Sequence, residues 1–84
     1  MKDGSLVHVV WIDSCATGGW NTKKGLASAT ICESVGWLAS STKETITVAG
    51  HKSDATGEWN GAMTIPRVAV RKLRGLSSLK GKVR

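Results

Sequence analysis

Tryptophan and basic side chains are the residues of this 84-residue chain whose types and positions could do chemistry together. The chain has four tryptophans and no tyrosine or phenylalanine. Trp20 stands in a Gly-rich polar run, and Trp59 follows the polar run of residues 51–58, so we expect both indoles to be partly exposed. An exposed indole is a surface on which a nucleotide base can stack.

Basic residues gather toward the C-terminal end. Residues 1–42 hold three lysines and three carboxylates, so the whole net charge of +6 arises in the second half of the chain. From residue 67 onward there is no acidic residue, and the basic ones are Arg67, Arg71, Lys72, Arg74, Lys80, Lys82 and Arg84. Such a block attracts phosphate-rich partners.

Together these features predict a site for an anionic ligand. Its residues are Trp20, Trp59, Arg67, Arg71, Lys72 and Arg74. Residues 67–74 interleave basic side chains with Val68, Val70 and Leu73, which indicates a half-buried structured segment that presents fixed charges. Stacking contributes about 1–3 kcal/mol per base, so Trp20 with Arg67 and Arg71 is the preferred arrangement. Alternatively, Trp20 folds back over the end of the domain as a lid.

Residues 13–15 are the nearest approach to a catalytic group. Asp13, Ser14 and Cys15 follow an apolar run, and with a histidine nearby they could form a nucleophile and its base. Asp and Ser directly after a strand usually close a turn on their own backbone, however. No glycine-rich phosphate loop leads into a helix either. We therefore predict no catalytic residue and no enzymatic activity.

The potential metal ligands are scattered along the chain. The cysteines are Cys15 and Cys32 and the histidines are His8 and His51, without the clustered spacing of a zinc site. We predict no metal site and no cofactor. His8 lies in a strand-like run, where a structural role is more common than ligation. The two thiols are expected to be reduced, although a disulfide between them stays open.

Five short strands must position these residues. Alternating or β-branched runs predict strands at residues 6–12, 31–39, 45–49, 59–65 and 68–73, with at most one helical turn near residues 22–27. Gly36 marks a bend or a close approach of two backbones. Trp11 and Trp37 lie within strands and are expected to pack in the core. Pro66 ends the fourth strand because proline cannot donate to the ladder.

The fold predicted from this succession is all-β: a small five-stranded SH3-like or Sm-like barrel with a long first loop. An OB-fold is the alternative. Residues 1–76 form the single domain, because the chain is too short for two cores, and residues 77–84 form a solvated basic tail. No apolar run is long enough to span a bilayer, so the expected location is the cytoplasm.

Two resemblances follow from short motifs. Ile65, Pro66 and Val70 resemble the I-P-x-x-x-V ending of SH3 domains, but the chain lacks the aromatic and acidic residues with which those domains bind proline-rich peptides. A wider pattern is similar to a family of short proteins of tailed-phage and prophage genomes: residues 11–14 (Trp-Ile-Asp-Ser), 19–20 (Gly-Trp), 34–38 (Ser-Val-Gly-Trp-Leu) and 65–67 (Ile-Pro-Arg), followed by Val70, Leu73 and Leu76. This resemblance implies a phage source and no particular activity.

The sequence therefore predicts a non-enzymatic binding protein that forms homo-oligomers. Its ligand would be RNA, single-stranded DNA or a nucleotide, such as a host defence signal sequestered during phage infection. The alternative is a protein-interaction module that docks onto a host or phage protein through strand edges and exposed tryptophans, with binding that depends less steeply on salt.

Overall fold

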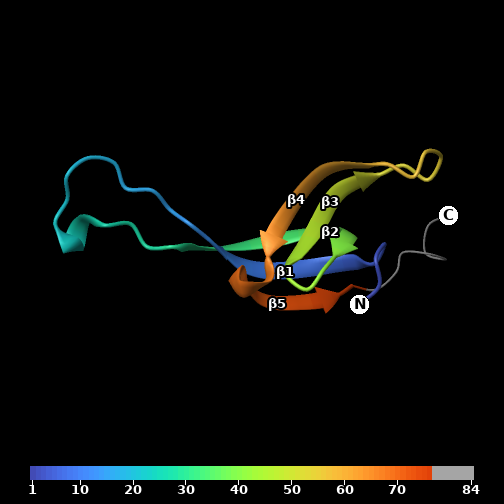
Figure 1. Cartoon of the computed structure of the whole chain (residues 1–84), viewed down its shortest axis with the longest axis horizontal. Coiled ribbons are helices and arrows are strands. Elements are labelled where there is room, and N and C mark those ends of the chain that lie inside the picture. Colours follow the sequence, from blue (N-terminus) through green and yellow to red (C-terminus); the bar gives the residue numbers. More distant parts are fainter. Residues whose placement is uncertain (77–84) are drawn as a thin grey trace.

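The computed structural model describes residues 1–76, so the predicted basic tail at 77–84 lies outside the described residues. The prediction of an all-β fold is confirmed (Figure 1). In chain order the elements are β1 (Leu6–Asp13), the 3₁₀ turn η1 (Lys23–Gly25), β2 (Thr30–Ser41), β3 (Thr45–Lys52), β4 (Trp59–Pro66), the 3₁₀ turn η2 (Arg67–Ala69) and β5 (Val70–Gly75).

All five strands belong to one antiparallel sheet with the order β4-β3-β2-β1-β5. The first part of β2 pairs with β1 and its last part pairs with β3, with a shift of register between Leu38 and Ser40. Figure 1 shows β3 and β4 turned away from β1, β2 and β5 at this point. The result is a small barrel-like sheet that is not closed, because β4 and β5 remain its two edges within residues 1–76.

One face of the sheet, here called the inner face, buries the core. The buried cluster consists of Val7, Val9, Leu38, Ile46, Val48 and Ile65, and Trp11, Ala69, Val70 and Leu73 pack against it. Every strand contributes to this set because β-branched and aliphatic residues alternate with polar ones. The indole N–H of Trp11 donates to Ser34 Oγ at 3.0 Å, which satisfies the one polar group of that side chain.

Gly36 lies where two backbones meet closely, as predicted. A Cβ atom built at this position would lie 2.5 Å from the carbonyl oxygen of Ala49 and 2.9 Å from Val48 Cγ1. No real Cβ tolerates such an approach to backbone, so any side chain here would push β2 away from β3. Glycine at residue 36 is therefore a condition for the pairing of these two strands.

Two packing predictions were wrong. Trp37 alternates with the buried Leu38, so it points to the opposite, outer face, where the Nζ of Lys52 lies 5.6 Å from its ring centre.

Val68 was expected in the last strand, but it lies in η2 and is 98% exposed. The cause is Pro66, whose fixed φ and missing N–H start a 3₁₀ turn and delay β5 to Val70.

A long arm separates β1 from β2. The arm, residues 14–29, contains η1 where the sequence predicted at most one helical turn, and none of its residues is buried. Figure 1 shows it projecting from one end of the molecule, whereas the turn between β3 and β4 lies at the other end. The molecule is accordingly elongated, with principal extents of 56 × 28 × 23 Å.

Neither of the short helical turns within residues 1–76 is long and apolar enough to cross a membrane.

Candidate anion-binding site

Three basic residues of β5 form a row on the edge of the sheet, here called the basic row: Arg71, Lys72 and Arg74. Lys72 pairs with Val10 and Arg74 pairs with His8, so both side chains lie on the outer face. Arg71 is the extra residue of a β-bulge, since the register shifts between Val10 and Trp11. All three are exposed. The predicted clustering of these charges on a structured segment therefore holds for β5.

His8 and Glu33 hold Arg74 in place. The Arg74 Nε–H donates to His8 Nδ1 at 3.2 Å, and His8 Nε2 lies 2.7 Å from Glu33 Oε1. Because arginine can only donate, Nδ1 must accept, and the imidazole proton then sits on Nε2 and is donated to Glu33. The side chain of His8 is only 16% exposed. This chain of contacts holds Arg74 through its Nε, and the residue remains exposed.

Arg67 is placed apart from the basic row. Its Nε–H donates to the carbonyl oxygen of Thr42 at 2.7 Å, its Nη2 donates to Ser41 Oγ at 2.5 Å, and its backbone N–H donates to the carbonyl oxygen of Glu44 at 2.8 Å. These bonds tie η2 to the turn between β2 and β3. The guanidinium that the sequence assigned to phosphate thus has a structural role in the monomer.

Trp20 lies on the arm with a relative exposure of 103%. The alternative in which Trp20 folds back over the end of the domain as a lid is wrong, because the arm extends away from the sheet (Figure 1). Few hydrogen bonds order the arm; they include Ala27 N–H to Thr17 Oγ1 at 2.7 Å and Asn21 Nδ2 to the Gly18 carbonyl oxygen at 2.8 Å. Trp20, Arg67 and Arg71 are not brought together in one chain. Lys23 and Lys24 of η1 are the basic residues beside Trp20.

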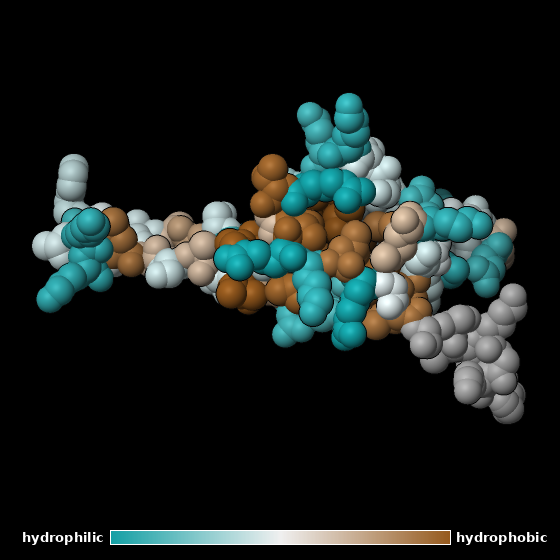
Figure 2. All heavy atoms as spheres, turned by 90° about the horizontal axis from the view of Figure 1, so that it is seen from below, coloured by the Kyte–Doolittle hydropathy of each residue, from teal (hydrophilic) through white to brown (hydrophobic). Residues whose placement is uncertain are grey.

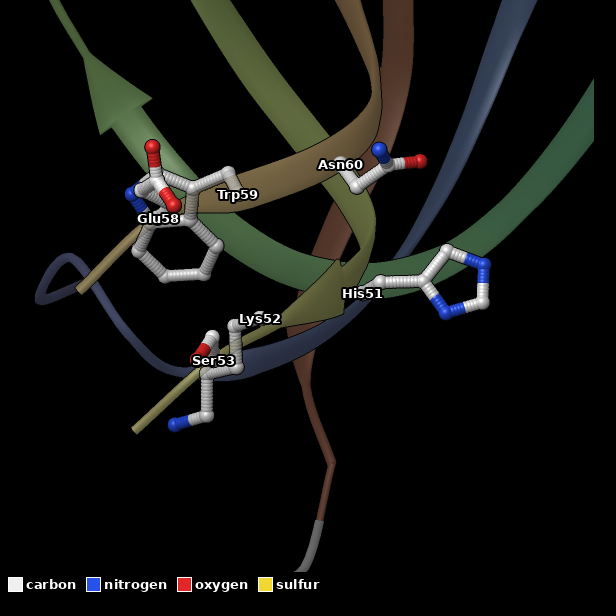
Figure 3. Close-up of a pocket in the computed structure, with 6 residues that line it drawn as sticks. All are labelled: His51, Lys52, Ser53, Glu58, Trp59 and Asn60. Carbon is white, nitrogen blue, oxygen red and sulfur yellow. The ribbon is translucent and has the colours of Figure 1, made fainter. Parts of the chain in front are cut away.

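Trp59 begins β4 and lines a hollow at the far end of the β3–β4 hairpin. This hairpin hollow has a volume of about 340 Å³ and is lined by His51, Lys52, Ser53, Glu58, Trp59 and Asn60. Figure 3 shows the ring of Trp59 with Glu58 beside it, across from Lys52 and Ser53. Trp59 is 38% exposed, which agrees with the prediction of partial exposure. No residue of the basic row lines the hollow.

Asp13 ends β1, and Ser14 and Cys15 continue the chain into the arm without the turn that the sequence suggested. The backbone N–H of Ser14 donates to Asp13 Oδ1 at 2.9 Å, so this carboxylate bonds to the backbone beside it. Cys15 and Cys32 are both free thiols, and Cys15 Sγ contacts Thr30 Oγ1 at 2.9 Å. Among residues 1–76, no three side chains of His, Cys, Asp or Glu come together as a group that could hold a metal ion.

Sequence reasoning missed the contact between His8 and Arg74. Alternation correctly places His8 and Glu33 on faces opposite their buried neighbours, but it does not determine which residues of β1 and β5 are partners. That register depends on a bulge at Arg71. A signal was present in β2, where Glu33 is the only charged residue; it pairs with Val10 and reaches His8 diagonally on the same face.

Figure 2 shows the molecule from below, which is the side on which β5 lies in Figure 1. On this face, hydrophilic side chains lie over a largely hydrophobic surface. The geometry is that of an open charged edge and not of an enclosed ligand cavity.

Comparison of the chain with protein-family models, with curated proteins and with solved structures found no match.

Proposed function

We propose that this protein is a non-enzymatic module that binds single-stranded nucleic acid through the basic row. The observation that supports it is the placement of Lys72 and Arg74 side by side on the outer face of an edge strand, with Arg71 on the adjacent bulge. Backbone phosphates are the common partners of such fixed cations, and contacts to phosphate position a strand without reading its sequence.

The outer face also offers an apolar surface for bases. Val10 on β1 lies between Lys72 on β5 and Glu33 on β2. In the same way, His8 on β1 lies between Arg74 on β5 and Val35 on β2. Val35 is 61% exposed, and the half-buried Trp37 lies two residues farther along β2 on the same face. Unstacked bases can lie on such a face while their phosphates meet the edge, a mode used by sheet-based binders of single strands. A duplex keeps its bases stacked inside and would not use this surface.

A polymer fits this geometry better than a small nucleotide. A free nucleotide is usually held in a concave site that buries most of its surface. The basic row lies on an exposed edge, and the hairpin hollow contains Glu58 and none of the row's cations. Capture of a nucleotide signal therefore has less support than binding of RNA or single-stranded DNA. The phage source, the cytoplasmic location and the lack of enzymatic activity stay predictions.

The test is the binding of a short fluorescent oligothymidylate, measured by fluorescence anisotropy at several salt concentrations. The variant Arg71→Ala/Lys72→Ala/Arg74→Ala should lose most of its affinity at low salt. It should also flatten the slope of log K against log salt by about 2, since each phosphate contact contributes about 0.7 for single strands. Lys23→Ala/Lys24→Ala is the control, because both lysines are exposed and lie on the arm, which projects away from the sheet (Figure 1).

Unchanged affinity in the triple variant, with a circular dichroism spectrum like that of the wild type, would overturn the proposal. Equal losses of affinity in the triple variant and in the control would also overturn the proposal, because they would show that binding depends on the net charge and not on the basic row.

A protein-interaction module is the second candidate, and the edge strand β4 favours it. Residues 59–64 of this strand are exposed, and β4 has no charged residue, whereas the opposite edge β5 is protected by its basic residues. Met63 is 48% exposed on this edge strand. An extended segment of another protein could add to such an edge. Binding to a host or phage protein at β4 would survive the triple substitution and would change little with salt.

A further inference from the structure

The arm has apolar surface that nothing in its own chain covers. Trp20 is 103% exposed and Leu26 is 57% exposed, and every residue from 13 to 31 is classed as exposed. An indole left in water lacks the favourable burial of its large apolar surface. Segments that project fully from a small domain with a tryptophan near the tip are suited to contact another molecule.

The hairpin hollow is an open recess large enough for an indole, with one aromatic ring among its lining residues. Its volume of about 340 Å³ is within the usual range for sites that hold small organic groups. The ring of Trp59 forms part of its wall, and aromatic rings pair favourably in offset or edge-to-face geometry. The hollow is also well ordered by its turn: Ser53 N–H donates to the Glu58 carbonyl oxygen at 2.9 Å, and Gly57 N–H donates to the Ser53 carbonyl oxygen at 2.8 Å.

The charges of the two regions are complementary. The arm contains Lys23 and Lys24 and no acidic residue. The β3–β4 turn contains Asp54 and Glu58, both exposed. Lys52 is the one cation among the residues of the hollow, and its ammonium group is engaged 5.6 Å above the ring of Trp37. An arm that brings Trp20 to Trp59 therefore also brings two lysines to two carboxylates.

The arm and the hollow lie at opposite ends of the molecule. Figure 1 shows the arm projecting from one end and the turn of the β3–β4 hairpin at the other. The arm of a chain therefore points away from its own hollow. A contact between the two must join different copies, either reciprocally in a closed two-fold dimer or head to tail in a ring or filament.

We infer that this protein assembles with itself by inserting Trp20 of one copy into the hairpin hollow of the next copy, with Lys23 and Lys24 facing Asp54 and Glu58. The inference does not depend on nucleic-acid binding, because the assembly requires only protein. In the assembly each hollow is completed by a residue of the neighbouring copy.

The test is native mass spectrometry together with light scattering of the full chain, without nucleic acid and over a range of concentrations. The wild type should form dimers or larger species. Trp20→Ala should raise the concentration of half-association at least about tenfold, as expected for an aromatic residue central to an interface. Val68→Ala is the control, since Val68 is 98% exposed and lies on η2.

Mixing of variants distinguishes a contact between arm and hollow from a contact between two arms or two hollows. Trp20→Ala retains a working hollow, and Asp54→Lys/Glu58→Lys retains a working arm. Each should be monomeric alone, and the mixture should stop at a 1:1 heterodimer, because one complementary contact remains. A chain with Lys23→Glu/Lys24→Glu/Asp54→Lys/Glu58→Lys should regain the wild-type assembly.

Three results would overturn the inference: a wild type that is monomeric at its highest soluble concentration, a Trp20→Ala protein that assembles like the wild type, or variants that fail to form the heterodimer. If Trp20→Ala lost oligothymidylate binding while the wild type was monomeric, Trp20 would instead belong to the nucleic-acid site.

Discussion

The sheet and the arm follow each other along one chain, yet they are stabilised in opposite ways. Within the sheet, apolar residues such as Val7, Ile46 and Ile65 are completely or almost completely buried. Within the arm no residue is buried, and the side chains of Thr17 and Asn21 bond to the backbone of the arm itself. The sheet is therefore specified by its own packing, whereas the arm has no buried residue that would specify its direction. Substitutions of the same kind should have unequal effects in the two regions.

The largest difference is expected for glycine replaced by alanine. Gly36→Ala would place a methyl group 2.5 Å from the Ala49 carbonyl oxygen and should cost about 3 kcal/mol or more, enough to unfold much of a domain this small. Gly18→Ala in the arm has open space around its added methyl and a φ outside the left-handed region, so it should leave stability unchanged. Thermal unfolding followed by circular dichroism measures both. Equal melting temperatures would mean that β2 and β3 do not approach as described.

Removal of the arm should change stability in the opposite direction. Asp13 and Thr30 are paired, so residues 14–29 can be replaced by Asn-Gly, which forms a two-residue hairpin turn. Each halving of the length of a flexible loop lowers the entropic cost of closing it by about 0.6 kcal/mol. The shortened loop should therefore raise the free energy of unfolding by up to about 2 kcal/mol. Urea titration gives this value. A clear loss of stability would show that the arm supports the sheet within one chain, and assembly should disappear in either case.

The sequence predicted the sheet better than the arm or the site, and the reasons differ. Strands follow from alternation, and Gly36 and Pro66 each have a local steric effect, so both were anticipated correctly. The partner of Arg74 could not be anticipated, because the register between β1 and β5 depends on a bulge at Arg71. Trp37 was misplaced because its size suggested the core, although its alternation with Leu38 already pointed outward. The direction of the arm depends on few contacts, so composition says little about it.

Backbone strain provides a smaller comparison. Gly61 in β4 has φ +67° and Gly19 in the arm has φ +75°, a conformation that costs other residues about 1–2 kcal/mol. Gly61→Ala should lower the free energy of unfolding by about that amount, because the paired strand cannot relax. Gly19→Ala meets the same strain, but the arm can change its backbone without opening the sheet, so the melting temperature should stay the same. A loss in both variants would make the arm part of the cooperative unit.

The smallest effect is expected for one methylene group. Ile46 is completely buried at the centre of the core, whereas Ile31 is 63% exposed on β2 beside the base of the arm. Ile46→Val should cost about 0.5–1.5 kcal/mol, since the lost contacts leave a small cavity. Ile31→Val should cost nothing measurable in the monomer, because its methyl groups already face water and valine suits a strand equally well. The measurement is chemical denaturation at a protein concentration low enough to keep the chain monomeric. A loss at Ile31 that appears only at high concentration would place the base of the arm, together with Trp20, in the contact between copies.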